Sequence, residues 1–204
     1  MGGRAFYAAQ LLSTFILLVD GLSVSPQSQV ESQLGYVPSN FVRIAASTAQ
    51  GDPVVLQTYP LAGGSPRRQR RCQSATPFPT LFWLCNASVN RAVADLERRG
   101  YVKQVEQLIL ESPDLATHLA ACHEDYAKMR WNSLSEDDRS RLPLNVISML
   151  RDSGIAGAAI VNVTETPSIK CLHAHYAHFR ATSNNPAGEI VHTILQREFP
   201  SLDL

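Results

Sequence analysis

The chain has 204 residues, of which 45% are hydrophobic and 18% charged, and this composition suits a single domain with a real core. Basic and acidic side chains number 18 each, so the sequence lacks the overall basicity of a general nucleic-acid binder. Four scattered cysteines without a CxxC pair exclude a small disulfide scaffold, a zinc ribbon and a thioredoxin-like motif. Two disulfides, with three connectivities, stay open.

Residues 1–23 have the pattern of a targeting signal. Arg4 makes the start positive, residues 5–19 form an apolar run, and Gly21-Leu22-Ser23 gives the small-x-small pattern that signal peptidase requires. The run is short for a membrane span, which needs about 20 apolar residues. We therefore expect entry into the secretory pathway or an organelle reached through it, such as a complex plastid, and no membrane segment once the signal is removed. The alternative is an uncleaved N-terminal segment that anchors the chain to a membrane.

A polar, flexible lead-in is expected over 24–32, followed by one domain over 33–200. Apolar runs bounded by turn residues predict four strands. These strands cover residues 41–46, 54–58, 81–85 and 158–163.

Helical periodicity begins after the third strand. Gly100 ends a first helix, a second ends near Ser112, and Ser112-Pro113 opens the third and longest. A short helix from Ser135 must break at Pro143, and Asn185-Pro186 starts the last one. The pattern predicts a single α+β domain, with a small sheet of about four strands packed against five or six helices.

An arginine-rich loop over 61–75 interrupts the strands. Its Arg67–Arg71 segment holds four arginines in five residues, which could grip the phosphates of an anionic ligand. No aromatic residue is interleaved, so there is no clear nucleic-acid signature. A solvated loop is the alternative that we favour.

The segment 170–179 concentrates three of the six histidines, and we expect a helix there. At about 100° per residue, an apolar stripe lies beside a second stripe formed by Cys171, His175 and His178. Thiolate and imidazole at this spacing suit zinc, with a fourth ligand from the third helix. The alternative is a buried thiol with hydrogen-bonded histidines, so the metal ligands are left open.

The same groups suit acid–base or nucleophilic chemistry if the third helix packs against the histidine-rich segment. The candidate catalytic residues are His123, Glu124, Asp125, Lys170, Cys171, His173 and His178. The loop carrying Thr76, Phe78 and Thr80 would form the floor of this site and contact substrate. A buried polar network that fixes the register of the helices is the competing interpretation.

Five motifs occur in one order along the chain. They are Gln33-Leu-Gly35, Pro53-Val-Val55, Thr76-Pro-Phe-Pro-Thr-Leu-Phe-Trp-Leu84, His123-Glu-Asp-Tyr126 and Lys170-Cys-Leu-His173 through His178. Together they resemble the bacterial family called domain of unknown function 501, over roughly residues 32–198. The resemblance implies a cytoplasmic-type domain without an established activity, and it favours His173 and His178 as the family's histidines. The added N-terminal segment suits a eukaryotic homologue.

The chain departs from the family pattern in two places. Ala46-Ser-Thr-Ala49 stands where the family carries Cys-Pro-x-Gly, and Leu84-Cys85-Asn86 stands where it tends to read Thr-Cys-Pro. The first departure removes a cysteine that could have joined a metal site shared by the family.

Two classes of function follow from the sequence. The first is a small enzyme, a hydrolase or transferase acting on a phosphorylated or nucleotide-like substrate at a Cys/His/Lys site. The second is a non-catalytic binding or scaffold module whose Cys/His cluster is a structural hydrogen-bond network or a zinc site.

Overall fold

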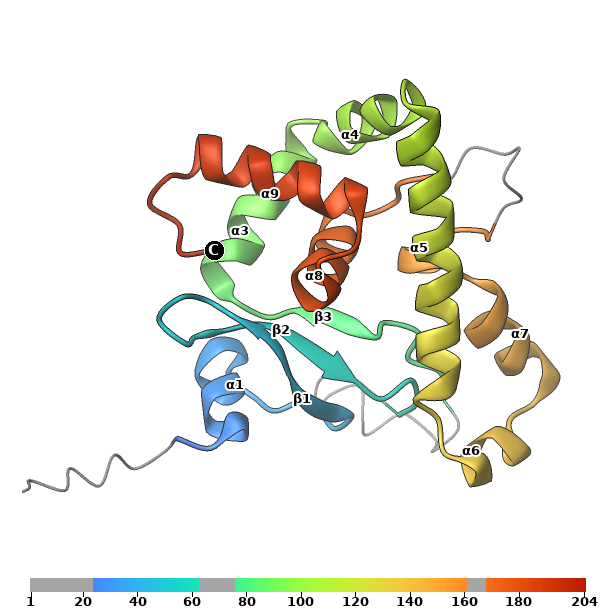
Figure 1. The fold of residues 1–204 in the computed structure, drawn as a ribbon. Helices are drawn as coiled ribbons and strands as arrows, with labels where there is room; N and C mark the ends of the chain where they lie inside the picture. Colours follow the sequence, from blue (N-terminus) through green and yellow to red (C-terminus); the bar gives the residue numbers. More distant parts are fainter. Residues whose placement is uncertain (1–23, 63–75, 161–167) are drawn as a thin grey trace, which may run out of the picture.

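The computed structural model describes residues 24–62, 76–160 and 168–204 (Figure 1). The expected targeting segment 1–23 and the Arg67–Arg71 cluster lie outside these residues. The elements are α1 (Pro26–Leu34), β1 (Phe41–Ser47), β2 (Pro53–Thr58), β3 (Phe82–Leu84), α3 (Ala87–Arg98), α4 (Tyr101–Leu110), α5 (Pro113–Asn132), α6 (Glu136–Arg141), α7 (Leu144–Asp152), the 3₁₀ turn η1 (Ile155–Gly157), α8 (Leu172–Thr182) and α9 (Pro186–Glu198). The predicted α+β class is confirmed. Every helix in the described ranges is too short or too polar to cross a bilayer.

The sheet has the order β1-β2-β3, and both strand pairs are antiparallel. Val54, Val55 and Leu56 of the central strand β2 are all completely buried, because helices cover both faces of the sheet. The described sheet therefore has three strands rather than about four. In the described part of the expected fourth strand, Ala159 forms only an isolated bridge with Ser153 across the turn η1, and residues 161–163 lie outside the described ranges.

Helix α1 replaces the flexible lead-in that the sequence led us to expect. Ser25 caps it by accepting a hydrogen bond from the Ser28 N–H at 3.1 Å, and Pro26 occupies the first turn. Val30 is completely buried against Leu56 and Cys85, and Leu34 packs against the same cluster. This small apolar cluster holds a largely polar helix against the sheet. Figure 1 shows α1 on the opposite side of the sheet from α8.

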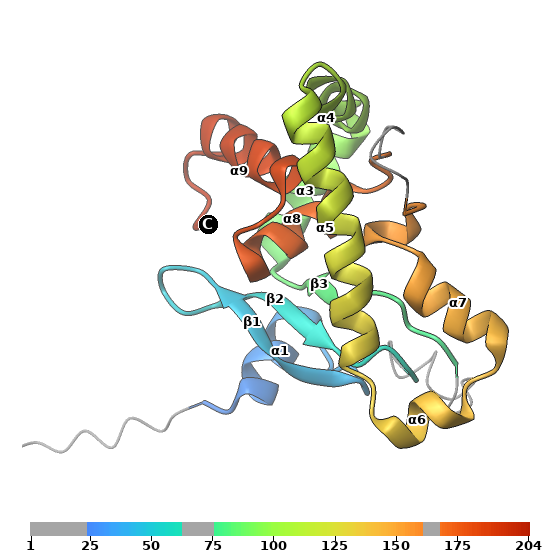
Figure 2. The ribbon, with the colours of Figure 1, turned by 45° about the vertical axis from the view of Figure 1, so that its right-hand side comes forward.

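Helix α8 lies at the centre of the main core. It contacts β2 and β3 on one side and α3 and α9 on others, and Figure 2 shows α5 running along the same layer. Leu172, Tyr176 and Ala177 are completely buried. The approach of α9 depends on Gly188, because a Cβ there would lie 2.4 Å from the carbonyl oxygen of His175.

Arg130 of α5 is a completely buried cation that the sequence did not predict. Its guanidinium donates to the carbonyl oxygens of Leu150 at 2.7 Å (from Nη2) and Pro79 at 3.1 Å (from Nη1), and also to that of Ser153. Burial lowers the pKa of Arg130, yet an arginine stays charged at neutral pH. The side chain therefore joins α5, the end of α7 and the segment that leads into β3.

We expect Arg130→Met to lower the free energy of unfolding by about 3 kcal/mol, because buried carbonyls would lose a charged donor. Arg151→Met is the matched control: it removes an exposed guanidinium 5.3 Å above the Trp131 ring and should cost less than about 1 kcal/mol. Urea denaturation measures both. Equal losses would show that the buried guanidinium does not join these segments.

Candidate functional site

The start of α8 divides the polar residues of this region into two groups. Cys171 precedes the helix with an extended backbone (φ −157°, ψ 119°), so its side chain leaves the face that carries His175 and His178. His173 also lies away from that face, because residues two apart on a helix differ by about 200°. The zinc set expected from Cys171, His175 and His178 is therefore not brought together.

The first group, which we call the Glu97 cluster, consists of Glu97 from α3 with Cys171 and His173. His173 Nδ1 lies 3.1 Å from Glu97 Oε1 and 4.0 Å from Cys171 Sγ. Glu97 Oε1 also accepts a hydrogen bond from the Leu172 N–H at 2.6 Å, which ties the carboxylate to the first turn of α8. One ligating atom from each of the three side chains lies within 4.8 Å of the others.

The protonation of His173 follows from its partners. Its Nε2 lies 3.2 Å from the carbonyl oxygen of Asn90, an acceptor, so Nε2 carries a hydrogen. Burial alone would lower the pKa of His173, but Cys171 and Glu97 outweigh it and raise the pKa to about 9. Burial opposes ionisation of Glu97 too, yet the charge and hydrogen bond of His173 hold its pKa below the ordinary value. At neutral pH the cluster therefore contains an imidazolium paired with a carboxylate.

A pocket of about 230 Å³ opens beside the Glu97 cluster, and we call it the β3 pocket. Its lining consists of Thr80, Phe82, Trp83, Leu84, Asn90, Cys171, His173 and Ala174. Of the two β3 aromatic residues in this lining, Phe82 is buried with its ring against Tyr126 and His178, and Trp83 is partly exposed. The pocket thus joins an apolar wall to a reactive polar one, which is the usual character of a small-molecule site.

The second group, which we call the histidine core, consists of His123, His175 and His178, each no more than 1% exposed. Asn185 caps α9 with its Oδ1, which accepts the Gly188 N–H at 2.9 Å. Its amide nitrogen must then donate to Nδ1 of His175 at 3.2 Å and to Nδ1 of His178 at 3.1 Å. Both rings accept at Nδ1, so in their neutral form both carry the hydrogen on Nε2.

His123 joins the same core from α5. The Ile155 N–H donates to its Nδ1 at 3.1 Å, and its ring meets that of His175 edge to face with centroids 5.6 Å apart. Gly154 allows the backbone before Ile155 to pass close to His123, because a Cβ at Gly154 would lie 2.6 Å from the Cβ of His123. His123 therefore has the same tautomer as the other two rings.

Burial is the main cause that keeps the histidine core neutral. It lowers the pKa of His123 and of His178 to about 4, and that of His175 to about 3. The Nε2 atoms of all three are buried and have no protein acceptor among the described residues. A positive charge on any of these buried rings would be costly, so the three histidines are poorly suited to accept a proton near neutral pH.

The sequence-predicted site residues are divided among three places. Cys171 and His173 line the β3 pocket, whereas His123 and His178 belong to the histidine core. Lys170 donates from Nζ to the carbonyl oxygen of Gly157 at 2.8 Å. The set expected in one pocket is thus not assembled.

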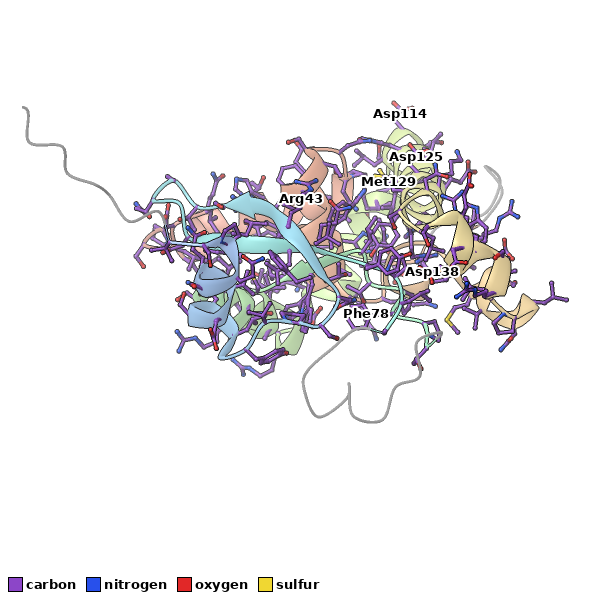
Figure 3. All side chains as sticks on the ribbon, turned by 90° about the horizontal axis from the view of Figure 1, so that it is seen from below. Arg43, Phe78, Asp114, Asp125, Met129 and Asp138 are labelled. Atoms are coloured by element: carbon purple, nitrogen blue, oxygen red, sulfur yellow. The ribbon has the colours of Figure 1, made fainter. Side chains whose placement is uncertain are left out.

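The acidic residues of α5 belong to neither group, although Asp125 and the core residue His178 line one shared pocket. Glu124 and Asp125 are exposed and form ion pairs with Lys128 at 3.5 and 3.3 Å. Figure 3 shows Asp125 projecting from α5 at the surface. Glu124 and Asp125 point about 100° and 200° away from His123 on the helix, which is why burial of His123 leaves both of them in solvent.

Of the loop residues expected to contact substrate, Thr80 lines the β3 pocket. Phe78 lies behind the pocket wall, with its ring centroid 5.9 Å from that of Trp83. Thr76 uses its carbonyl oxygen to accept the Ala62 N–H at 2.8 Å. The loop therefore contributes its last residue directly and Phe78 as support.

Sequence reasoning missed Glu97, Asn90 and Asn185. Glu97 and Asn90 lie on α3, and no spacing in the sequence links them to Cys171. Asn185 was expected at the start of the last helix, but its second role as a donor to two histidines needs the packing of α8 against α9. The three described thiols, at Cys85, Cys122 and Cys171, are free.

The two groups predict a stability maximum near pH 6.5. Unfolded histidines titrate near pH 6.5, whereas the core histidines resist protonation until pH 3–4. The unfolded chain therefore binds protons first, and stability is lost as pH falls from 6.5 towards 4, by up to about 4 kcal/mol per pH unit for three rings. His173 has the opposite sign: its contribution is complete below pH 6.5 and is lost as pH rises through 9.

Urea denaturation at pH 5, 6.5 and 9 checks this profile. His173→Gln should flatten the alkaline side and leave the acid side unchanged, whereas His118→Gln, at an exposed position, should alter neither. Equal stability of the wild-type chain at pH 5 and 6.5 would contradict the neutral histidine core.

A family model described as "Protein of unknown function (DUF501)" matches residues 44–193, a range that includes both the Glu97 cluster and the histidine core. The searches of curated proteins and of solved structures gave no match. The matched range covers most of the chain, and the protein belongs to the DUF501 family.

Proposed function

We propose that this protein is a small enzyme, a hydrolase or transferase, whose substrate binds in the β3 pocket and reacts at the Glu97 cluster. The observation that carries the proposal is that a thiol and an imidazole, Cys171 and His173, line a concave pocket, and that the Glu97 carboxylate contacts them from α3. They come from two segments that are far apart in sequence, α3 and the start of α8. Reactive groups of three kinds at one pocket are typical of a catalytic site.

The exposure of the cluster supports chemistry rather than a purely structural role. The side chains of His173 and Glu97 are 24% and 27% exposed, whereas the histidine core is sealed. A structural network gains most where water is excluded and every ring is held by packing. The three core rings are buried and packed together, although their Nε2 atoms lack partners among the described residues, so we apply the scaffold interpretation to His123 and His178 and the enzyme proposal to the Glu97 cluster.

The lining of the pocket supports a small anionic substrate with a flat part. Trp83, which is partly exposed in the lining, offers aromatic surface on which a planar ring can stack. His173 also lines the pocket and is protonated at neutral pH, but Glu97 pairs with this charge, so a phosphoryl or carboxylate group would have to compete with Glu97 for it. A phosphorylated or nucleotide-like compound combines the two features.

The second candidate is a binding module that recognises the same class of ligand without converting it. The pairing of His173 with Glu97 favours it, because a satisfied ion pair can hold a binding surface in place. The two candidates differ in turnover and agree on the location of the ligand.

We expect purified protein to convert at least one member of a panel of phosphate monoesters, phosphodiesters and nucleotides, measured by phosphate or product release. His173→Gln and Cys171→Ser should each reduce kcat/KM by about 100-fold or more, because loss of one positioned acid–base or reacting group typically has this effect. His118→Gln, on the exposed side of α5, should change it less than about threefold. Circular dichroism and thermal melting establish that the variants are folded.

Three outcomes separate the candidates. Turnover that survives both pocket substitutions would place the reaction elsewhere and refute the proposal. Binding without turnover, lost in His173→Gln, would support the binding module instead. Absence of both binding and turnover across the panel would refute the substrate class.

A further inference from the structure

We propose that Glu97, Cys171 and His173 bind one Zn²⁺ ion, with the fourth coordination position open to the β3 pocket. The inference rests on the proposed function in that it supplies the cofactor of the same site. Three protein ligands with one open position form the usual arrangement of catalytic zinc, whereas structural zinc has four protein ligands.

The spacing of the three donor atoms fits a tetrahedral ion. Zinc bonds of about 2.0–2.3 Å separate neighbouring ligand atoms by roughly 3.3–3.6 Å. His173 Nδ1 is 3.1 Å from Glu97 Oε1 and 4.0 Å from Cys171 Sγ, so these two distances differ from tetrahedral spacing by only a few tenths of an ångström. All three atoms already lie within 4.8 Å of one another.

Hydrogen bonds from outside the cluster hold two of the donor side chains in place. His173 donates from Nε2 to the Asn90 carbonyl oxygen, which leaves Nδ1 as the atom that can coordinate a metal. The Leu172 N–H holds the Glu97 carboxylate at 2.6 Å. Metal-binding histidines and carboxylates usually have such outer partners, and losing them weakens metal binding.

The types of donor select the metal. Thiolate and imidazole suit Zn²⁺, whereas Mg²⁺ and Ca²⁺ prefer oxygen ligands throughout. Cys171 and His173 line the same pocket as Thr80 and Trp83, so a water molecule or a phosphoryl oxygen of the substrate in that pocket could take the fourth position. The ion would therefore supply positive charge where the reacting group binds.

The histidine core is a poor competitor for the same ion although it holds three imidazoles. Asn185 and the Ile155 N–H donate to its Nδ1 atoms, so those atoms are not free to coordinate. The remaining Nε2 atoms carry hydrogens in the neutral rings. In the Glu97 cluster one ligating atom from each side chain lies within 4.8 Å of the others, and the three core histidines are not grouped this closely. Binding should therefore depend on Cys171 and His173 and not on the core.

The test uses the full chain stripped of metal with a chelator. Calorimetric titration with Zn²⁺ should show about one equivalent bound with sub-micromolar Kd, and the thermal midpoint should rise. Titration with Co²⁺ should give a thiolate-to-cobalt charge-transfer band and the visible spectrum of tetrahedral cobalt. Cys171→Ala should abolish the charge-transfer band, and Glu97→Gln and His173→Gln should weaken Zn²⁺ binding roughly 100-fold or more.

Cys122→Ala and His118→Gln are the matched controls, because both remove the same donor types from α5 and should leave affinity within about threefold. Absence of a bound equivalent, or a cobalt–thiolate band that survives Cys171→Ala, would overturn the zinc proposal. If zinc fails while Cys171→Ser and His173→Gln still lose turnover, the enzyme proposal stands with metal-free thiol chemistry. If zinc binds but no panel substrate is bound or converted, the zinc site stands and the proposed function fails.

Discussion

The rotation of α8 about its own axis fixes the arrangement of both polar groups. Leu172 and Tyr176 are completely buried between the sheet and the surrounding helices, and this burial leaves the helix one orientation. His175 must then enter the core, while His173 faces α3 and the β3 pocket. Rotation by about half a turn would exchange these environments, because His173 and His175 point about 200° apart on the helix. The apolar anchors therefore decide which histidines are available for chemistry.

The two groups use the same side chain in opposite electrostatic states. Desolvation holds the histidine core neutral and lowers its pKa values, and Asn185 fixes the tautomers while also capping α9. In the Glu97 cluster a carboxylate reverses the effect of burial, so His173 gains a proton. The protonation state of a histidine therefore cannot be read from the sequence, because burial and the neighbouring charges determine it. The core specifies the packing of α5, α8 and α9, and the cluster is left to interact with ligands.

Periodicity and capping signals predicted most of the elements. Pro143 separates α6 from α7, and Asn185 caps α9 as expected, because proline geometry and N-cap chemistry act locally. The lead-in was predicted incorrectly: α1 is polar in composition, and Val30 finds a buried site that only the folded sheet creates. The site was predicted in part. Cys171 and His173 were identified from their own segment, whereas Glu97 is supplied by a distant helix whose position depends on tertiary packing.

Long-range ¹H–¹⁵N correlation NMR of the metal-free, ¹⁵N-labelled protein at pH 7 tests the division of the histidines most directly, because it reads the protonation of each ring nitrogen. The account predicts neutral rings with the hydrogen on Nε2 for His123, His175 and His178, and a doubly protonated ring for His173. A neutral His173 at pH 7, or core rings that become charged near pH 6.5, would contradict it.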